Sequence, residues 1–333
     1  MSEVLHILNG RSTEYTLRQS AVPGEFFAFR DVLIDGPAPA ATTAEQWRQL
    51  RARHLAAAYG VDQEACERDL LDQEAVLASH NQHEEVVLWF EHDLFCQLNL
   101  LYLLDWFARA PVAPKRLSLI NIGEFPGRKS FRGLGELSVT ELSSLFLQRS
   151  LITTDQLQLA TQAWSAHCSS DPAKIESLLR ADTSALPFLQ TAFAAHLRRF
   201  PATKNGLGQI ENTALRLIDE GCEKFVDVFP RFATCEPVYG LGDAQLWLGL
   251  SALSNAPIPL LTIEDNARSS AAMRAELSPS ARFKLTPEGR AVVRQQADFI
   301  ELNGIDSWLG GAHLHGPDVI WRWNEETGKL HAG

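Results

Sequence analysis

The tripeptide Glu91-His92-Asp93 is the densest group of chemically capable side chains in the sequence. It lies between VVLWF, typical of a buried strand, and LFCQLNLLYLLDWF, typical of an apolar helix. Glu91 and Asp93 could hold Mg²⁺ or another divalent cation, which prefers oxygen ligands. Alternatively, one carboxylate could act as a general base while His92 exchanges protons. In a purely structural interpretation, Asp93 caps the helix while Glu91 and His92 are solvated.

Further polar residues follow other strand-like segments, and His6 lies inside the first one. Ligands of an open parallel sheet bind outside the carboxyl ends of its strands. The catalytic candidates are therefore Glu91, His92, Asp93 and Asp31. The candidate substrate-binding residues are Asn9, Gly10, Ser12, Arg30 and His6.

Most of these candidates also have a structural interpretation. Arg30 and Asp31 could form an ion pair, and His6 could be a satisfied core histidine. Asp35-Gly36-Pro37 is typical of a turn. Arg48 and Arg51, three residues apart in a helical pattern, either clamp an anion or belong to a solvated charged face. The sequence contains no Walker, G-x-S-x-G or H-E-x-x-H motif that would decide the chemistry.

Residues 1–130 predict a Rossmann-like α/β domain. Short runs rich in branched and aromatic residues predict strands at 4–8, 25–29, 85–90 and 117–122. Helical patterns lie at 13–20, 43–59, 63–80 and 94–108. Near-continuous apolar strands that alternate with helices favour a parallel sheet covered on both faces.

The remaining chain predicts two further parts. Residues 131–200 contain helical patterns alone and are interpreted as a helical connector. Residues 201–333 combine helices, a strand at FKL and terminal β segments, which resembles a winged-helix-like α+β domain. In the terminal segments, His313 and His315 share a face, but the sequence indicates no third metal ligand beside them.

Composition narrows the classes of partner. The 333 residues are 45% hydrophobic, as in ordinary globular proteins. Their net charge of −11 disfavours nucleic acid and anionic membranes as partners, because both are negatively charged. The start of the sequence resembles no secretory signal and no segment is long and apolar enough to span a bilayer, so we expect a cytoplasmic protein. Five scattered cysteines predict free thiols. The expected partner is a small anionic molecule or a nucleotide; the sequence leaves the oligomeric state open.

The predicted winged-helix-like part has little charge with which to bind DNA. Residues 198–333 hold 14 Lys or Arg and 17 Asp or Glu. The candidate recognition helix, GDAQLWLGLSALSN, contains one acid and no base, whereas DNA recognition relies on Lys and Arg. Packing or protein contact is therefore favoured over DNA binding.

The chain resembles the bacterial family called domain of unknown function 1835. The motifs that carry this resemblance extend over nearly the whole chain: HILNGRS, FRDVLIDGP, WRQLRARHL, VVLWFEHDLFCQLNLLYLLDWF, DTSALPFLQTAFAAHLRRFP, NGLGQIE and WLGG-H…WRW. The family has no assigned reaction, so the resemblance implies a shared site and no named chemistry. The family has acidic residues where this chain has Arg11 and Cys96, which implies a weaker polycarboxylate metal centre here.

Three hypotheses follow. In the first, the protein is an enzyme, a hydrolase in the broad sense, that performs phosphoryl or phosphodiester chemistry on an anionic substrate at the carboxyl edge of the sheet. In the second, the protein is a ligand-sensing regulator whose winged-helix-like part contacts protein or DNA. In the third, the polar strand ends are caps and turns of a scaffold protein.

Overall fold

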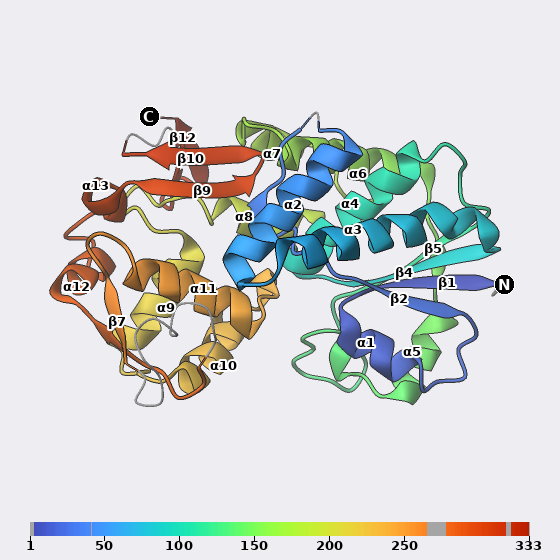
Figure 1. The fold of residues 1–333 in the computed structure, drawn as a ribbon, viewed down its shortest axis with the longest axis horizontal. Helices are drawn as coiled ribbons and strands as arrows, with labels where there is room; N and C mark the ends of the chain where they lie inside the picture. The colour runs from blue at the N-terminus through green and yellow to red at the C-terminus, as the bar shows by residue number, and fades with distance from the viewer. Residues whose placement is uncertain (1–2, 41, 265–277, 318–320, 333) are drawn as a thin grey trace.

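The computed structural model describes residues 3–40, 42–264, 278–317 and 321–332, and its centre is a five-stranded sheet (Figure 1). Four strands are parallel and lie where the sequence predicts them, while the short fifth is antiparallel and was not predicted. The spatial order is β2 (Glu25–Phe29), β1 (Val4–Asn9), β4 (Glu85–Glu91), β5 (Leu117–Ile122) and β6 (Ser150–Leu151). The predicted α/β class and parallel sheet are confirmed.

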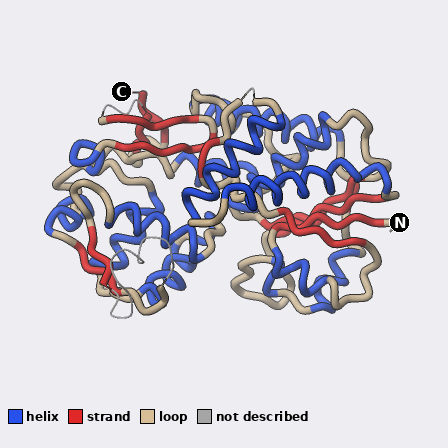
Figure 2. Tube along the Cα trace, in the orientation of Figure 1, coloured by secondary structure: helices blue, strands red, loops and turns tan. Residues whose placement is uncertain are grey.

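Helices cover both faces of this sheet (Figures 1 and 2). Alternate residues of β4 enter two different hydrophobic cores: Val87 and Trp89 enter one, and Leu88 and Phe90 enter the other. The smaller core lies under α1 (Arg11–Leu17) and α5 (Val139–Phe146). The larger lies on the side of α2 (Ala44–Tyr59), α3 (Gln63–Ala78) and α4 (Leu94–Arg109). Burial on both faces explains why β4 is a continuous apolar run.

Helix α4 is apolar on most sides because it is covered on most sides. It packs against the sheet, and α6 (Thr154–His167) and α8 (Leu189–Leu197) pack against it in turn. The short helix α7 (Ala173–Leu178) follows α6. The predicted helical region after residue 138 is therefore observed, with β6 as its one strand among the described residues.

The remaining helices gather in a second lobe. Its helices are α9 (Gln209–Asp219), α10 (Phe225–Cys235), α11 (Asp243–Ser254), α12 (Pro287–Val293) and α13 (Phe299–Asn303). The predicted FKL strand is β8 (Arg282–Leu285), which pairs in antiparallel fashion with an unpredicted partner, β7 (Leu261–Glu264). Among the described residues, no helix is long and apolar enough to cross a membrane.

The two terminal β segments form two separate hairpins. The first is β9 (Ile305–Gly310) with β10 (Ala312–Gly316), and the second is β11 (Trp321–Asn324) with β12 (Lys329–Ala332). Strand β9 also pairs in parallel with β3 (Gly36–Pro37), a two-residue strand that follows β2. The chain therefore returns at its end to the segment that leaves the sheet domain.

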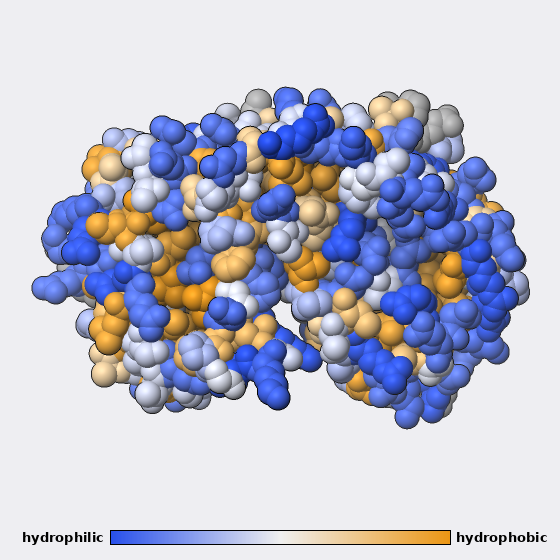
Figure 3. Space-filling view, turned by 180° about the vertical axis from the view of Figure 1, so that it is seen from behind, coloured by the Kyte–Doolittle hydropathy of each residue, from blue (hydrophilic) through white to orange (hydrophobic). Residues whose placement is uncertain are grey.

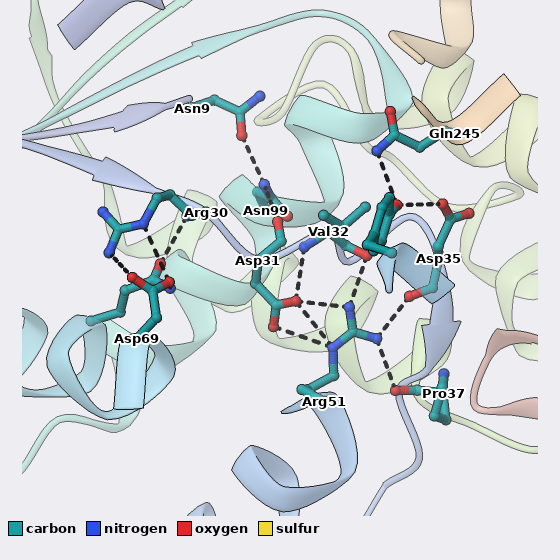
Figure 4. Close-up of polar contacts among 12 residues, drawn as sticks. Asn9, Arg30, Asp31, Val32, Asp35, Pro37, Arg51, Asp69, Asn99 and Gln245 are labelled. Atoms are coloured by element: carbon teal, nitrogen blue, oxygen red, sulfur yellow. Dashed lines mark hydrogen bonds and ion pairs between the residues drawn. The ribbon is translucent and has the colours of Figure 1, made fainter. Parts of the chain in front are cut away.

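A buried arginine holds the segment before β3 (Figure 4). Arg51 on α2 is fully buried, and its Nη2 lies 2.7 Å from an oxygen of Asp31. It also donates to the carbonyl oxygens of Val32 (2.8 Å) and Asp35 (2.7 Å). One guanidinium thus neutralises a buried carboxylate and satisfies the backbone of a tight turn.

We expect Arg51→Met to destabilise the chain strongly. The substitution keeps most of the side-chain volume but leaves Asp31 buried without its counterion, which costs about 3 to 5 kcal/mol. Urea denaturation measures the free energy of unfolding. Arg53→Ala is the matched control, because Arg53 is exposed on the same helix and its loss should change stability by less than about 0.5 kcal/mol. Equal effects of the two substitutions would contradict the assigned role of Arg51.

Candidate functional site

A cavity of about 420 Å³ lies at the carboxyl ends of β1 and β4. The chain runs from β1 to β2 on one side and then crosses to β4 on the other, so this is the switch point where ligands of open α/β sheets bind. The opposite wall comes from α10 and the turn at Pro237–Tyr239 in the second lobe. Figure 3 shows the surface hollowed between the two lobes at its lower edge.

Glu91 ends β4 and forms part of the cavity wall, although its side chain is almost completely buried. One carboxylate oxygen accepts a hydrogen bond from the backbone N–H of Leu134 (2.7 Å), and the other accepts from the Cys96 thiol (2.7 Å). The structural interpretation in which Glu91 is solvated is therefore wrong. The sheet and the loop at residue 134 enclose it instead.

Asp93 caps α4, as the structural interpretation expected, and it also lines the cavity. Its Oδ1 accepts from the backbone N–H of Cys96 at 2.9 Å. Gly240 from the second lobe lies directly against it: a Cβ at Gly240 would stand 2.0 Å from Asp93 Oδ1, and the φ of Gly240 is 62°. Only glycine combines this backbone conformation with so close an approach.

Burial disfavours the ionised form of both carboxyl groups. It raises the pKa of Glu91 to about 7, and the negative charge of Asp93 adds to the effect. Burial likewise raises the pKa of Asp93. A carboxyl group that exchanges its proton near neutral pH is suited to acid–base catalysis and is a mark of functional sites.

Cys96 is a hydrogen-bond donor rather than a nucleophile. Burial and the neighbouring carboxylates raise the pKa of its thiol well above the ordinary value, so it keeps its proton at neutral pH. Asn9 donates to its sulfur (Nδ2 to Sγ, 2.8 Å), and Asn99 donates to Asn9 (2.7 Å). The side chain of Asn9 thus orients Cys96, and through it Glu91.

The predicted residues Gly10, Ser12 and His92 also line this cavity. The His92 ring has an edge-on contact with Phe188 at 6.0 Å between centroids, and its buried Nδ1 has no hydrogen-bond partner in the described structure. Arg11 and Arg132 bring positive charge to the same walls. The cavity lining therefore combines the two buried acids and two further glutamates, Glu136 and Glu236, with two arginines.

Three other predicted site residues lie away from this cavity. His6 is buried within the sheet, where its Nδ1 accepts from the Trp89 indole (3.0 Å) and burial lowers its pKa to about 4. Arg30 forms an ion pair with Asp69 on α3, and Asp31 is the counterion of Arg51 (Figure 4). The ion pair between Arg30 and Asp31 that the structural alternative expected is wrong, because each of the two residues has a different partner. The core-histidine alternative does describe the surroundings of His6. We assign none of the three residues a contact with a ligand of this cavity.

The donors around Glu91 and Asp93 do not suit Mg²⁺. Their ligand atoms and that of Cys96 lie within 4.8 Å of one another. However, three of the four carboxylate oxygens already accept hydrogen bonds from Leu134 or Cys96, and the third donor is a thiol. Mg²⁺ requires an octahedral set of oxygen ligands, which these three residues do not provide.

Several wall residues could not be found from the sequence. Arg132 and the second-lobe residues Phe232, Glu236 and Gly240 reach the cavity only through the tertiary fold. The one local sequence signal for these wall residues is the pair of glycines in RGLGE (132–136) and in YGLGD (239–243). Such glycines are typical of places where the backbone approaches another group closely.

No family model matches the chain, and no curated protein matches it significantly in sequence. The assignment of the site therefore depends on its geometry.

The raised pKa of Glu91 predicts a pH-dependent stability. Between pH 4.5, the ordinary pKa, and about 7, the folded chain keeps a proton that the unfolded chain releases, so stability falls as the pH rises through this window. Glu91→Gln cannot ionise. We expect its free energy of unfolding, relative to the parent, to rise by up to about 3 kcal/mol between pH 5 and pH 8.

Urea denaturation at several pH values measures this difference. Glu25→Gln is the control, since Glu25 is exposed at the start of β2 and its substitution should leave the pH profile of stability unchanged. A Glu91→Gln profile parallel to that of the parent would show that Glu91 is ionised in the folded chain throughout.

Proposed function

We propose that the protein is an enzyme that performs phosphoryl or phosphodiester hydrolysis on a small anionic substrate, with a nucleotide as one candidate. The observation that carries this proposal is the position of Glu91, a buried carboxyl group with a pKa of about 7 on the wall of a cavity that Arg11 and Arg132 also line. Guanidinium groups bind phosphate oxygens, and a nearby proton acceptor can activate water.

Each residue has a distinct part in this proposal. Glu91 in its ionised form accepts the proton of the attacking water, and the Cys96 thiol holds that carboxylate in place. Arg11 and Arg132 neutralise charge on the phosphate. His92 lines the same cavity and would supply a proton to the leaving oxygen.

The divalent cation predicted at Glu91 and Asp93 stays a prediction. The dependence of the rate on Mg²⁺ distinguishes a mechanism that uses this cation from the one proposed here. Because three of the four carboxylate oxygens already accept hydrogen bonds and the third candidate ligand is the Cys96 thiol, we expect Mg²⁺ and a chelator to leave the rate unchanged. A rate that requires Mg²⁺ would instead favour the two carboxylates as metal ligands.

The winged-helix-like character of residues 201–333 and the resemblance to the domain of unknown function 1835 family are also proposals. Three helices followed by an antiparallel strand pair, from α9 to β8, support the winged-helix-like character.

The alternative function, a ligand-sensing regulator, is favoured by one feature. The cavity has walls from both lobes, so a ligand would contact the sheet edge and α10 together.

The enzyme proposal is tested with nitrophenyl phosphate monoesters and diesters, followed by a panel of nucleotides, at pH 7. We expect turnover by the parent and a loss in kcat of about 100-fold or more for Glu91→Gln, because general-base catalysis contributes at least that much. Arg132→Ala should raise KM roughly tenfold through the loss of a charge-assisted contact.

Arg116→Ala is the control for the arginine variant, because Arg116 is exposed just before the amino end of β5. It should retain the parent's kcat and KM. A Glu91→Gln variant as active as the parent would rule out Glu91 as the base, and the absence of turnover on every ester and nucleotide would overturn the enzyme proposal.

The regulator proposal makes a different prediction. If residues 201–333 contacted DNA, selection from random duplexes should enrich one sequence, and binding should weaken steeply with salt. Since α11 contains Asp243 and no basic residue, we expect no enrichment at physiological salt. An enriched sequence whose binding a nucleotide alters would favour the regulator.

A further inference from the structure

Three side chains of the β9–β10 hairpin converge on its solvent-exposed face. His313 and His315 alternate along β10, and Asp306 lies directly opposite His315 on β9. His313 Nε2 is 2.7 Å from Asp306 Oδ1, and His315 Nδ1 is 3.7 Å from Asp306 Oδ2. The sequence places the two histidines on one face, but only the strand register brings a third donor to them.

The opposite face of the hairpin is fixed by the core. Leu309, Ala312 and Leu314 are buried there, so the alternation of the strands holds the three polar side chains outward. The His313 ring also stacks on Trp308, with centroids 4.3 Å apart and planes 3° from parallel. One ligand ring is thus oriented before any ion binds, which lowers the entropic cost of binding.

We propose that Asp306, His313 and His315 bind a divalent transition cation of the Zn²⁺ class. Their ligand atoms lie within 4.8 Å of one another. Ligands about 2.0 to 2.2 Å from a tetrahedral Zn²⁺ stand roughly 3.5 Å apart, so His313 and Asp306 need only separate slightly while His315 moves inward. All three side chains are exposed and have room for these movements.

The donor types set the selectivity of this site. Two imidazoles and one carboxylate suit Zn²⁺, Co²⁺ or Ni²⁺, whereas Mg²⁺ and Ca²⁺ require oxygen ligands. Three protein ligands leave a tetrahedral ion one open position, which water or an outside group fills. This site is separate from the cavity between the lobes and does not depend on the proposed hydrolysis.

Isothermal titration of the full chain, stripped of metal, with ZnCl₂ tests the proposal. We expect one ion per chain and at least a tenfold loss of affinity in His315→Ala and in Asp306→Asn, because even loss of a residue that merely supports a metal ligand costs that much. Zn²⁺ should also raise the Tm of the parent and not of these variants. His331→Ala is the matched control, since His331 is exposed on the neighbouring hairpin opposite Arg322, and it should bind like the parent.

A second pair of measurements separates this site from the cavity. Cys96→Ala should keep the parent's affinity, and the Co²⁺-loaded chain should lack the near-ultraviolet charge-transfer band of a thiolate ligand. Loss of binding in Cys96→Ala would place the ion beside Glu91 and overturn the proposal. A parent chain that binds no Zn²⁺ would also overturn the proposal. So would His315→Ala and Asp306→Asn variants that bind Zn²⁺ as tightly as the parent, provided that their Tm without metal equals that of the parent.

Discussion

The guanidinium of Arg51 is the constraint on which the arrangement of the chain depends. It is fully buried and reaches a carboxylate and several carbonyl oxygens of residues 31–37, so it fixes the turn between β2 and β3. That turn gives β3 the position from which it pairs with β9. The buried ion pair thus supports the pairing of two segments about 270 residues apart in the chain.

Further polar contacts tie the same segment to the chain after α8 and to the second lobe. Arg199, just after α8, donates to the carbonyl oxygen of Ile34 (2.6 Å) and pairs with Asp35 (3.2 Å). Tyr59 donates to Asp35 at 3.4 Å and accepts from Gln245 of α11 at 3.0 Å. Since the cavity has one wall from each lobe, contacts that set the position of the lobes also set its width.

A chain of hydrogen bonds leads from this turn to Glu91. Asn99 donates to the carbonyl oxygen of Asp31 and to Asn9, Asn9 donates to the sulfur of Cys96, and the Cys96 thiol donates to Glu91. This chain of hydrogen bonds reaches Asp31 only at its backbone carbonyl. The Asp31 carboxylate, which the sequence placed among the catalytic candidates, is bound by Arg51 instead.

The sequence was informative where local pattern decides structure. Apolar runs located four strands, and the rule for strand ends selected Asn9, Glu91 and Asp93, which meet at the cavity. It could not reveal that Arg51 takes Asp31 as its partner, because a buried and a solvated arginine have the same helical spacing. Nor could it find β3, whose two residues show no period, or Asp306, which strand register alone places beside His315.

The buried pair Glu91 and Asp93 is an arrangement that folding alone does not favour. Each carboxyl group loses hydration, and the charge of one raises the pKa of the other, so the native state is less stable at neutral pH than it would be with neutral side chains there. Glycines leave room for both side chains: a Cβ at Gly240 would collide with Asp93, and a Cβ at Gly133 would crowd Glu91. A destabilising pair beside two such close backbone approaches supports the proposed catalytic role, because Asp93 needs no second carboxyl group beside it to cap α4.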